Sequence, residues 1–224
     1  MIRNFRYVDR VLRGATEPGS GNSSLGVGHG IAMMILGGVL YGTAMGAFGG
    51  LTGSGLLQMS YSAAKVPILI VVTAALAMPS FFVLNSLLGL RTDFGEVLKA
   101  LAVTQTAVAV ILASLAPYTI LWYASTTDYQ EAMLFNAVMF AIASLAAQWV
   151  LRRRYVPLIA RNSRHRVMLR VWLGMYAFVG IQMGWVLRPF IGQPGRPATF
   201  FREDAWANAY VFIFEAIWNE LSRW

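Results

Sequence analysis

Long runs of apolar residues make up most of the chain and are separated by short polar stretches. A helix needs about 20 residues, at about 1.5 Å each, to cross the hydrocarbon layer of a membrane. Five runs reach that length, at 30–50, 66–89, 97–124, 132–151 and 167–187. Because lipid leaves every backbone polar group to be satisfied within the protein, the pattern predicts an all-α, polytopic transmembrane helix bundle with five spans.

The two ends of the chain have a different pattern, in which charged and apolar residues recur at helical spacing. Near the N-terminus the charged positions are Arg3, Arg6, Arg10 and Arg13, and residues 205–224 carry Glu215 and Glu220 beside several tryptophans. A charge at the bilayer centre costs about 2.5–3.5 kcal/mol, so we expect interfacial amphipathic helices at both ends. A further short interfacial helix is expected at 51–65.

These patterns divide the chain into three parts. They are a cytoplasmic amphipathic and linker segment at 1–30, a five-span transmembrane domain at 31–190, and an outer-face loop with an amphipathic C-terminal helix at 191–224. Basic residues set the orientation, because cytoplasmic loops carry an excess of Lys and Arg. With the N-terminus inside, thirteen basic residues lie on the cytoplasmic side and five outside. We therefore expect an inner (plasma) membrane protein with its C-terminus outside.

The net charge of +8 also allows a nucleic-acid partner, but 16 of the 18 basic residues are arginines set at the edges of apolar runs. That placement is typical of membrane flanks. We expect the lipid bilayer as the partner, with anionic headgroups bound along 152–170 at the cytoplasmic face, and no nucleic acid. His165, between two arginines of that loop, is interpreted as part of a cation patch.

Glycines recur at every fourth position of the first span, at Gly38, Gly42, Gly46 and Gly50. Residues four apart share one helix face, so these glycines form a groove in which another helix can approach closely. The pattern predicts a helix-packing face, either within the chain or against a second copy or partner subunit.

The polar side chains inside the spans are amides and hydroxyls, and no acidic residue lies deep in a predicted span. Carriers coupled to protons or sodium ions usually need such a carboxylate, and the sequence has no cysteine, metal-binding motif or nucleotide-binding motif. We expect no enzyme activity, cofactor or metal. Two low-specificity sites remain open: a polar cavity formed by Gln105, Gln148 and Gln182, and a clasp between Arg188 and Asp128.

Three strings carry a resemblance to known proteins: LQMSYSAAKVP at 57–67, PSFFVLN at 79–85 and QMGWVLRPFIG at 182–192. Together they resemble a group of uncharacterised bacterial multi-pass membrane proteins, and the likeness extends from about residue 35 onward. The Lys-x-Pro entry to the second span and the five-span plan also resemble Yip1-type membrane proteins. The resemblance implies a fold and no activity.

The function that these features favour is that of a non-catalytic subunit, scaffold or membrane organiser. The alternative is a small channel or uniporter with an amide-lined cavity. A water-accessible cavity between the last three spans would favour transport, and a dry bundle would favour the scaffold.

The orientation gives a first testable prediction. A reporter that is active only outside the cytoplasm, fused after Trp224, is expected to be active, because thirteen of the basic residues would then be cytoplasmic. A matched fusion of a reporter active only in the cytoplasm serves as the control. If only the cytoplasmic reporter is active, the orientation is wrong and 205–224 forms a sixth span.

Overall fold

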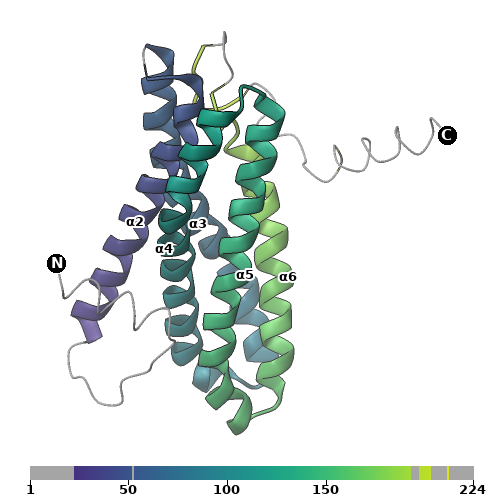
Figure 1. Cartoon of the computed structure of the whole chain (residues 1–224). Helices are drawn as coiled ribbons and strands as arrows, with labels where there is room; N and C mark the ends of the chain where they lie inside the picture. Colours follow the sequence, from purple (N-terminus) through teal and green to yellow (C-terminus); the bar gives the residue numbers. More distant parts are fainter. Residues whose placement is uncertain (1–22, 52, 193–196, 203–210, 212–224) are drawn as a thin grey trace.

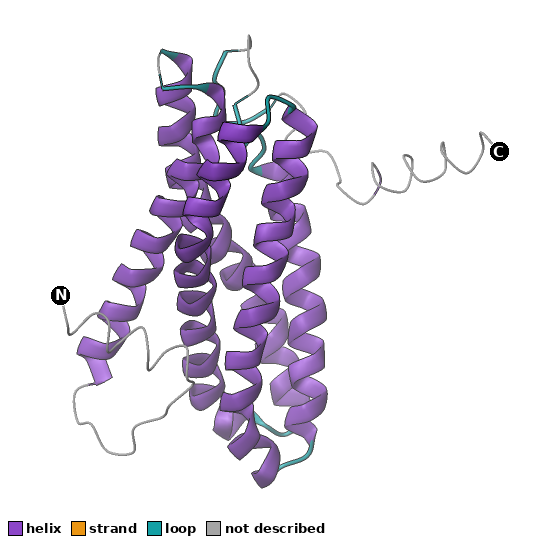
Figure 2. Cartoon of the chain, in the orientation of Figure 1, coloured by secondary structure: helices purple, strands orange, loops and turns teal. Residues whose placement is uncertain are grey.

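The computed structural model describes residues 23–51, 53–192, 197–202 and 211, and these form a bundle of five long helices (Figure 1). The helices are α2 (Ser23–Gly46), α3 (Ser54–Leu87), α4 (Phe94–Ser125), α5 (Tyr129–Arg161) and α6 (Arg164–Val186), with short 3-10 turns η1 (Ala47–Gly49) and η2 (Arg91–Asp93). Helix and loop are the only conformations in this part of the chain (Figure 2).

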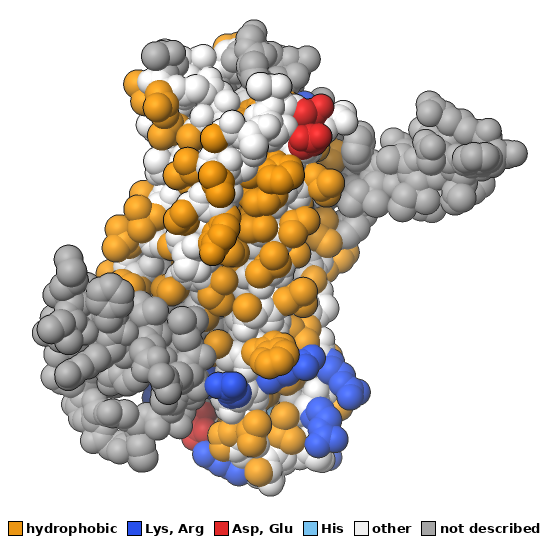
Figure 3. Space-filling view, viewed as in Figure 1, with side chains coloured by type: hydrophobic (Ala, Val, Ile, Leu, Met, Phe, Trp, Pro, Cys, Tyr) orange, Lys and Arg blue, Asp and Glu red, His pale blue; other side chains and the backbone are white. Residues whose placement is uncertain are grey.

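The prediction of an all-α fold with five spans is confirmed. Five helices of the described residues are long and apolar enough to cross a membrane. Apolar side chains cover the middle of the bundle, and Lys and Arg gather at one end (Figure 3). The expected surface helices lie mainly outside the described residues, since 1–22, 203–210 and 212–224 are not among them.

The second span begins earlier than its apolar run predicts. Residues expected to form a separate interfacial helix, 51–65, mostly belong to α3, which is 34 residues long. At about 1.5 Å per residue such a helix exceeds the hydrocarbon layer of about 30 Å. Pro67 therefore lies inside α3, as does Pro79, and Pro117 lies inside α4. Lys65, which marked the expected boundary, is fully buried.

Helices that follow one another in sequence are not always the ones that pack most closely. α2 packs extensively against both α3 and α4, α4 against α5, and α3 against α6, whereas α3 and α4 touch over a small area. Two groups of buried side chains fill the interior. One surrounds Tyr41 and Leu112, and the other surrounds Phe81, Tyr155 and Trp172.

The glycines of α2 face α3 of the same chain. A Cβ atom added to Gly38 would lie 2.9 Å from Cγ of Pro67, and one added to Gly46 would lie 2.7 Å from Cα of Met59. A Cβ at Gly42 would collide with the carbonyl oxygen of Ser62. Hydrogen in place of a side chain is what lets the two backbones approach to this distance.

Two glycines differ from the expected row. Gly50 lies beyond the helix with φ of 96°, and nothing is within 4 Å of a Cβ built on it, so it is a turn residue and not a packing residue. Gly37, which is out of register with the row, lies against α4, where an added Cβ would be 2.6 Å from the carbonyl oxygen of Ala109. α2 thus uses glycine on two faces.

The close approach of α2 and α3 predicts that replacing glycine with alanine affects stability differently at two positions. Gly42→Ala is expected to destabilise the protein by about 1–3 kcal/mol, because the new methyl group overlaps backbone atoms of α3. Gly174→Ala on α6 is expected to be neutral or to stabilise by up to about 1 kcal/mol, because no atom lies within 4 Å of its Cβ. Thermal unfolding midpoints in detergent measure both, and equal midpoints would contradict the packing argument.

Candidate functional site

A row of polar side chains on α3 holds the segment that follows α6. Gln58, Ser62 and Lys65 lie about one turn apart on one face of the helix and are buried. Nε2 of Gln58 and Nζ of Lys65 both donate to the carbonyl oxygen of Pro189, at 3.2 and 2.6 Å. The hydroxyl of Ser62 donates to the carbonyl oxygen of Phe190. Two of the strings that carried the resemblance, 57–67 and 182–192, therefore form one structural unit.

Lys65 is the most unusual member of this row, because its side chain carries an amino group and is fully buried. Its Nζ lies 4.8 Å from the ring centroid of Phe200 and 6.0 Å from that of Phe190. No carboxylate of the described residues is within ion-pair distance of it. A carbonyl dipole and two aromatic faces are what stabilise the ammonium group here. The arrangement is suited to holding a loop in place.

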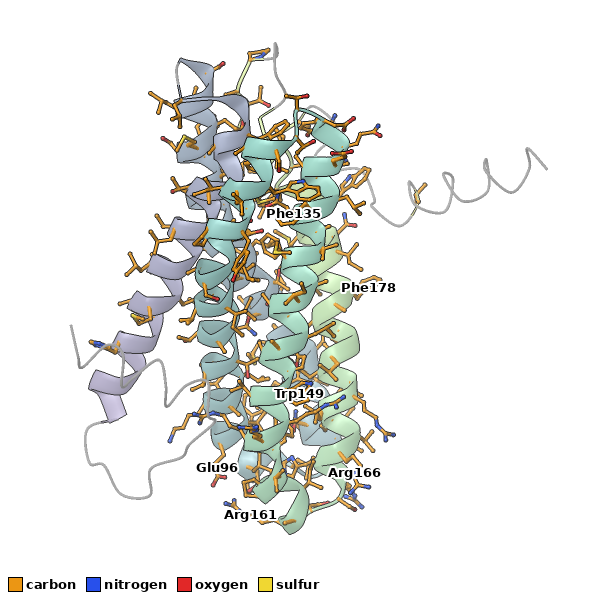
Figure 4. All side chains as sticks on the ribbon, viewed as in Figure 1. Glu96, Phe135, Trp149, Arg161, Arg166 and Phe178 are labelled. Atoms are coloured by element: carbon orange, nitrogen blue, oxygen red, sulfur yellow. The ribbon has the colours of Figure 1, made fainter. Side chains whose placement is uncertain are left out.

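A second polar cluster joins two loops at the end of the bundle where Lys and Arg gather. Nε2 of His165 lies 3.0 Å from Oδ2 of Asp93, and Nη1 of Arg161 lies 3.0 Å from Oε1 of Glu96 (Figure 4). His165 is fully buried. The interpretation of His165 as part of an exposed cation patch is therefore wrong, because the imidazole points inward to a carboxylate of η2.

A groove of about 1090 Å³ lies among α3, α4, α5, α6 and the segment after α6. Most of its wall is aliphatic or aromatic. The polar side chains on the wall are Thr73, Tyr129, Ser144, Gln148, Arg152, Tyr176, Arg188 and Arg202. In a bundle surrounded by lipid, such a composition suits an amphiphilic molecule better than a column of water.

The three glutamines expected to line one cavity do not share it. Gln148 lies on the wall of the groove. Gln105 is set back behind it, where its Oε1 accepts a 2.7 Å hydrogen bond from the hydroxyl of Tyr176, a wall residue. Gln182, on the neighbouring helix α6, is not among the lining residues.

The expected clasp between Asp128 and Arg188 is absent from the described ion pairs. Asp128 caps the N-terminus of α5, accepting from the backbone N–H groups of Gln130 and Glu131 at 2.6 and 3.1 Å. The guanidinium carbon of Arg188 lies 3.1 Å from the ring centroid of Trp185. The carboxylate of Asp128 therefore caps its own helix, whose first backbone N–H groups have no partner within the helix and attract an anion.

Sequence reasoning missed the parts of both sites that depend on tertiary contacts. Lys65 was placed outside the spans, although polar residues at Gln58, Ser62 and Lys65 recur at helical spacing and mark one face. Arg152 is predicted to meet anionic headgroups, but nothing in the sequence places it in one groove with Thr73. The packing of α3 against α6, with α5 on the other side of the groove, brings the two residues to one wall.

The burial of Lys65 gives a testable prediction, and the one other lysine of the chain, Lys99, provides a control. Lys65→Met is expected to lower stability by about 1.5–3 kcal/mol, the worth of a hydrogen bond to a charged group, and to speed amide exchange at 190–192. Lys99→Met, at an exposed position, is the control and is expected to change neither. In the parent, an amine-acylating reagent should modify Lys99 and spare Lys65. Rapid acylation of both lysines in folded protein would contradict the buried site.

Comparison with known proteins adds no relative. No protein-family model, curated protein or solved structure matches the chain. The resemblance to bacterial multi-pass proteins therefore stays a prediction, and the conclusion that this is a multi-pass membrane protein rests on its five long apolar helices.

Proposed function

We propose that this protein is a non-catalytic subunit or organiser of the inner membrane that gathers anionic lipids at its arginine-rich end. We define that end by three of its exposed arginines, Arg152, Arg166 and Arg170, near the joined ends of α5 and α6. It would face the cytoplasm, in keeping with the basic-residue rule.

The observation that carries the proposal is the separation of charge at this end. The described acidic residues nearby, Asp93 and Glu96, already contact His165 and Arg161. The three arginines therefore belong to a positive surface next to apolar helix faces, at the end where Lys and Arg gather (Figure 3). Each basic residue near an anionic membrane surface contributes about 1 kcal/mol of attraction, so three together would hold a local excess of acidic lipid.

Partner binding, to a second copy or another membrane subunit, belongs to the same proposal. The glycines at 38, 42 and 46 face α3 of this chain, so a partner would use a different surface. The outer face of α5 is available, since it carries large exposed apolar side chains along most of its length. These are Met133, Leu134, Val138, Ile142, Leu145 and Trp149.

Transport by a small channel or uniporter is the second candidate. Three uncharged polar side chains on the wall of the groove, Thr73, Ser144 and Gln148, favour it. The mostly apolar wall around them favours the organiser instead. Flux of ions or small polar solutes into liposomes containing the purified protein would establish transport.

Lipid gathering can be measured by energy transfer from labelled protein to fluorescent phosphatidylglycerol in mixed liposomes. Arg166→Gln together with Arg170→Gln is expected to reduce local enrichment up to about fivefold for each charge removed, because each contributes about 1 kcal/mol. Added salt should reduce the parent's enrichment as well. Fluorescent phosphatidylcholine is the control and should be unaffected. Enrichment that is equal in parent and variant would refute the organiser role of this surface.

A further inference from the structure

The groove opens sideways, toward the surrounding lipid. Its lining includes Met133, Leu145 and Trp149 of α5, which are 49%, 68% and 68% exposed, and Ile181 of α6, which is 49% exposed. Side chains that both line a groove and remain this exposed form its rim. Trp149 lies on α5 toward the end that carries Arg161 (Figure 4). A molecule can therefore enter from the membrane without crossing the bundle.

Two residues on the wall of the groove each carry a buried polar atom without a hydrogen-bond partner among the described residues. The atoms are Oγ1 of Thr73, whose residue is 2% exposed, and Oε1 of Gln148. A buried polar atom left in this condition costs about 1–3 kcal/mol. The amide of Gln148 can also present its N–H₂ group, since its two ends are distinguished only by their hydrogen bonds. Both side chains can thus donate to an acceptor in the groove.

The two unpartnered groups lie at a similar height in the bundle. α5 and α6 are antiparallel and joined at Asn162 and Ser163, so Gln148 on α5 lies level with Ala177 on α6, about one turn from Gly180. A Cβ on Gly180 would be 3.5 Å from Cγ2 of Thr73. Thr73 and Gln148 therefore lie on different walls of the groove, within about one helical turn of each other in height.

A cation lies one turn away from that level. Arg152 follows Gln148 by four residues on α5, shares its face and also lines the groove. On the other side of the polar level the wall is apolar, with Ala141 and Leu145 of α5 facing Ile181 of α6. From Arg152 inward the groove thus offers a positive charge, hydrogen-bond donors and an apolar stretch of wall. Arg188 and Arg202 also line the groove, and the guanidinium group of Arg188 stacks on the ring of Trp185.

We propose that this groove binds one anionic phospholipid from the leaflet at the arginine-rich end. Its phosphate lies against Arg152, its glycerol ester carbonyls accept from Thr73 and Gln148, and an acyl chain follows the apolar wall between α5 and α6. The order of groups along the lipid matches the order along the groove. Arginine suits this role because its planar fork of donors matches phosphate oxygens.

The size of the groove is close to that of a small-molecule site. Such sites typically span about 300–1,000 Å³. The groove, at about 1090 Å³, lies just above that range. Its volume therefore suits one chain-like amphiphile.

Native mass spectrometry of the whole chain tests this proposal. After purification from membranes and an extended detergent wash, the parent is expected to retain about one phospholipid per chain, enriched in anionic species. Gly180→Leu, which places a side chain in the groove, is expected to abolish retention. Gly174→Leu on the same helix is the matched control, because its Cβ has open space and it does not line the groove.

The headgroup contact is tested by a second pair of variants. Arg152→Gln is expected to reduce the preference for anionic over neutral lipid about fivefold, and Thr73→Val to reduce retention of both. Arg166→Gln, which is exposed and outside the groove, should retain lipid as the parent does. This separates the groove from the gathering surface, since Arg166 serves only the surface. Equal retention in Gly180→Leu and Gly174→Leu, or a dimer that survives the wash in place of lipid, would overturn the proposal.

Discussion

The arrangement of the bundle depends on the close approach of α2 to α3. Inside lipid there is no hydrophobic force between helices, so dispersion contacts and hydrogen bonds hold them together, and both require short distances. Gly38 accommodates the ring of Pro67, and Gly42 lies against the carbonyl of Ser62. Any side chain at these positions would separate the helices. α3 is thereby fixed along its first half and in turn carries α6, whereas α4 packs on α2, and α5 packs on α4.

α6 is attached to α3 at both of its ends. At one end Lys65 of α3 holds the carbonyl of Pro189, beyond the last turn of α6. At the other, Nη1 of Arg164 donates to the carbonyl oxygen of Leu88 at 2.9 Å, just past the end of α3. α6 therefore follows α3, and its contact with α5 is much smaller although the two are consecutive. Because α6 packs mainly on α3 and less on α5, a groove remains between α5 and α6.

Much of the fold could be predicted from the sequence, because length and apolarity are local properties that lipid enforces. The start of α3 could not, since Lys65 has the chemistry of a boundary residue, and its burial depends on tertiary contacts with the carbonyl of Pro189 and the rings of Phe190 and Phe200. The groove was predicted in part. Gln148 is expected in a polar cavity, but Thr73 of α3 and Arg152 of α5 reach the same wall only through the tertiary packing of the bundle.

The chain uses its two kinds of cation for different purposes. Lysine is a compact point charge, and the buried Lys65 meets a single carbonyl with aromatic rings around it. The exposed basic residues near the joined ends of α5 and α6 are all arginines, whose forked donors match phosphate oxygens in a way that an ammonium group cannot. Arginine is preferred throughout the chain, at 16 of the 18 basic positions, and Lys99 on α4 is also exposed. The arginines at 152–154, 161, 164, 166 and 170 can nevertheless hold phosphate oxygens through a two-point contact that a lysine cannot make.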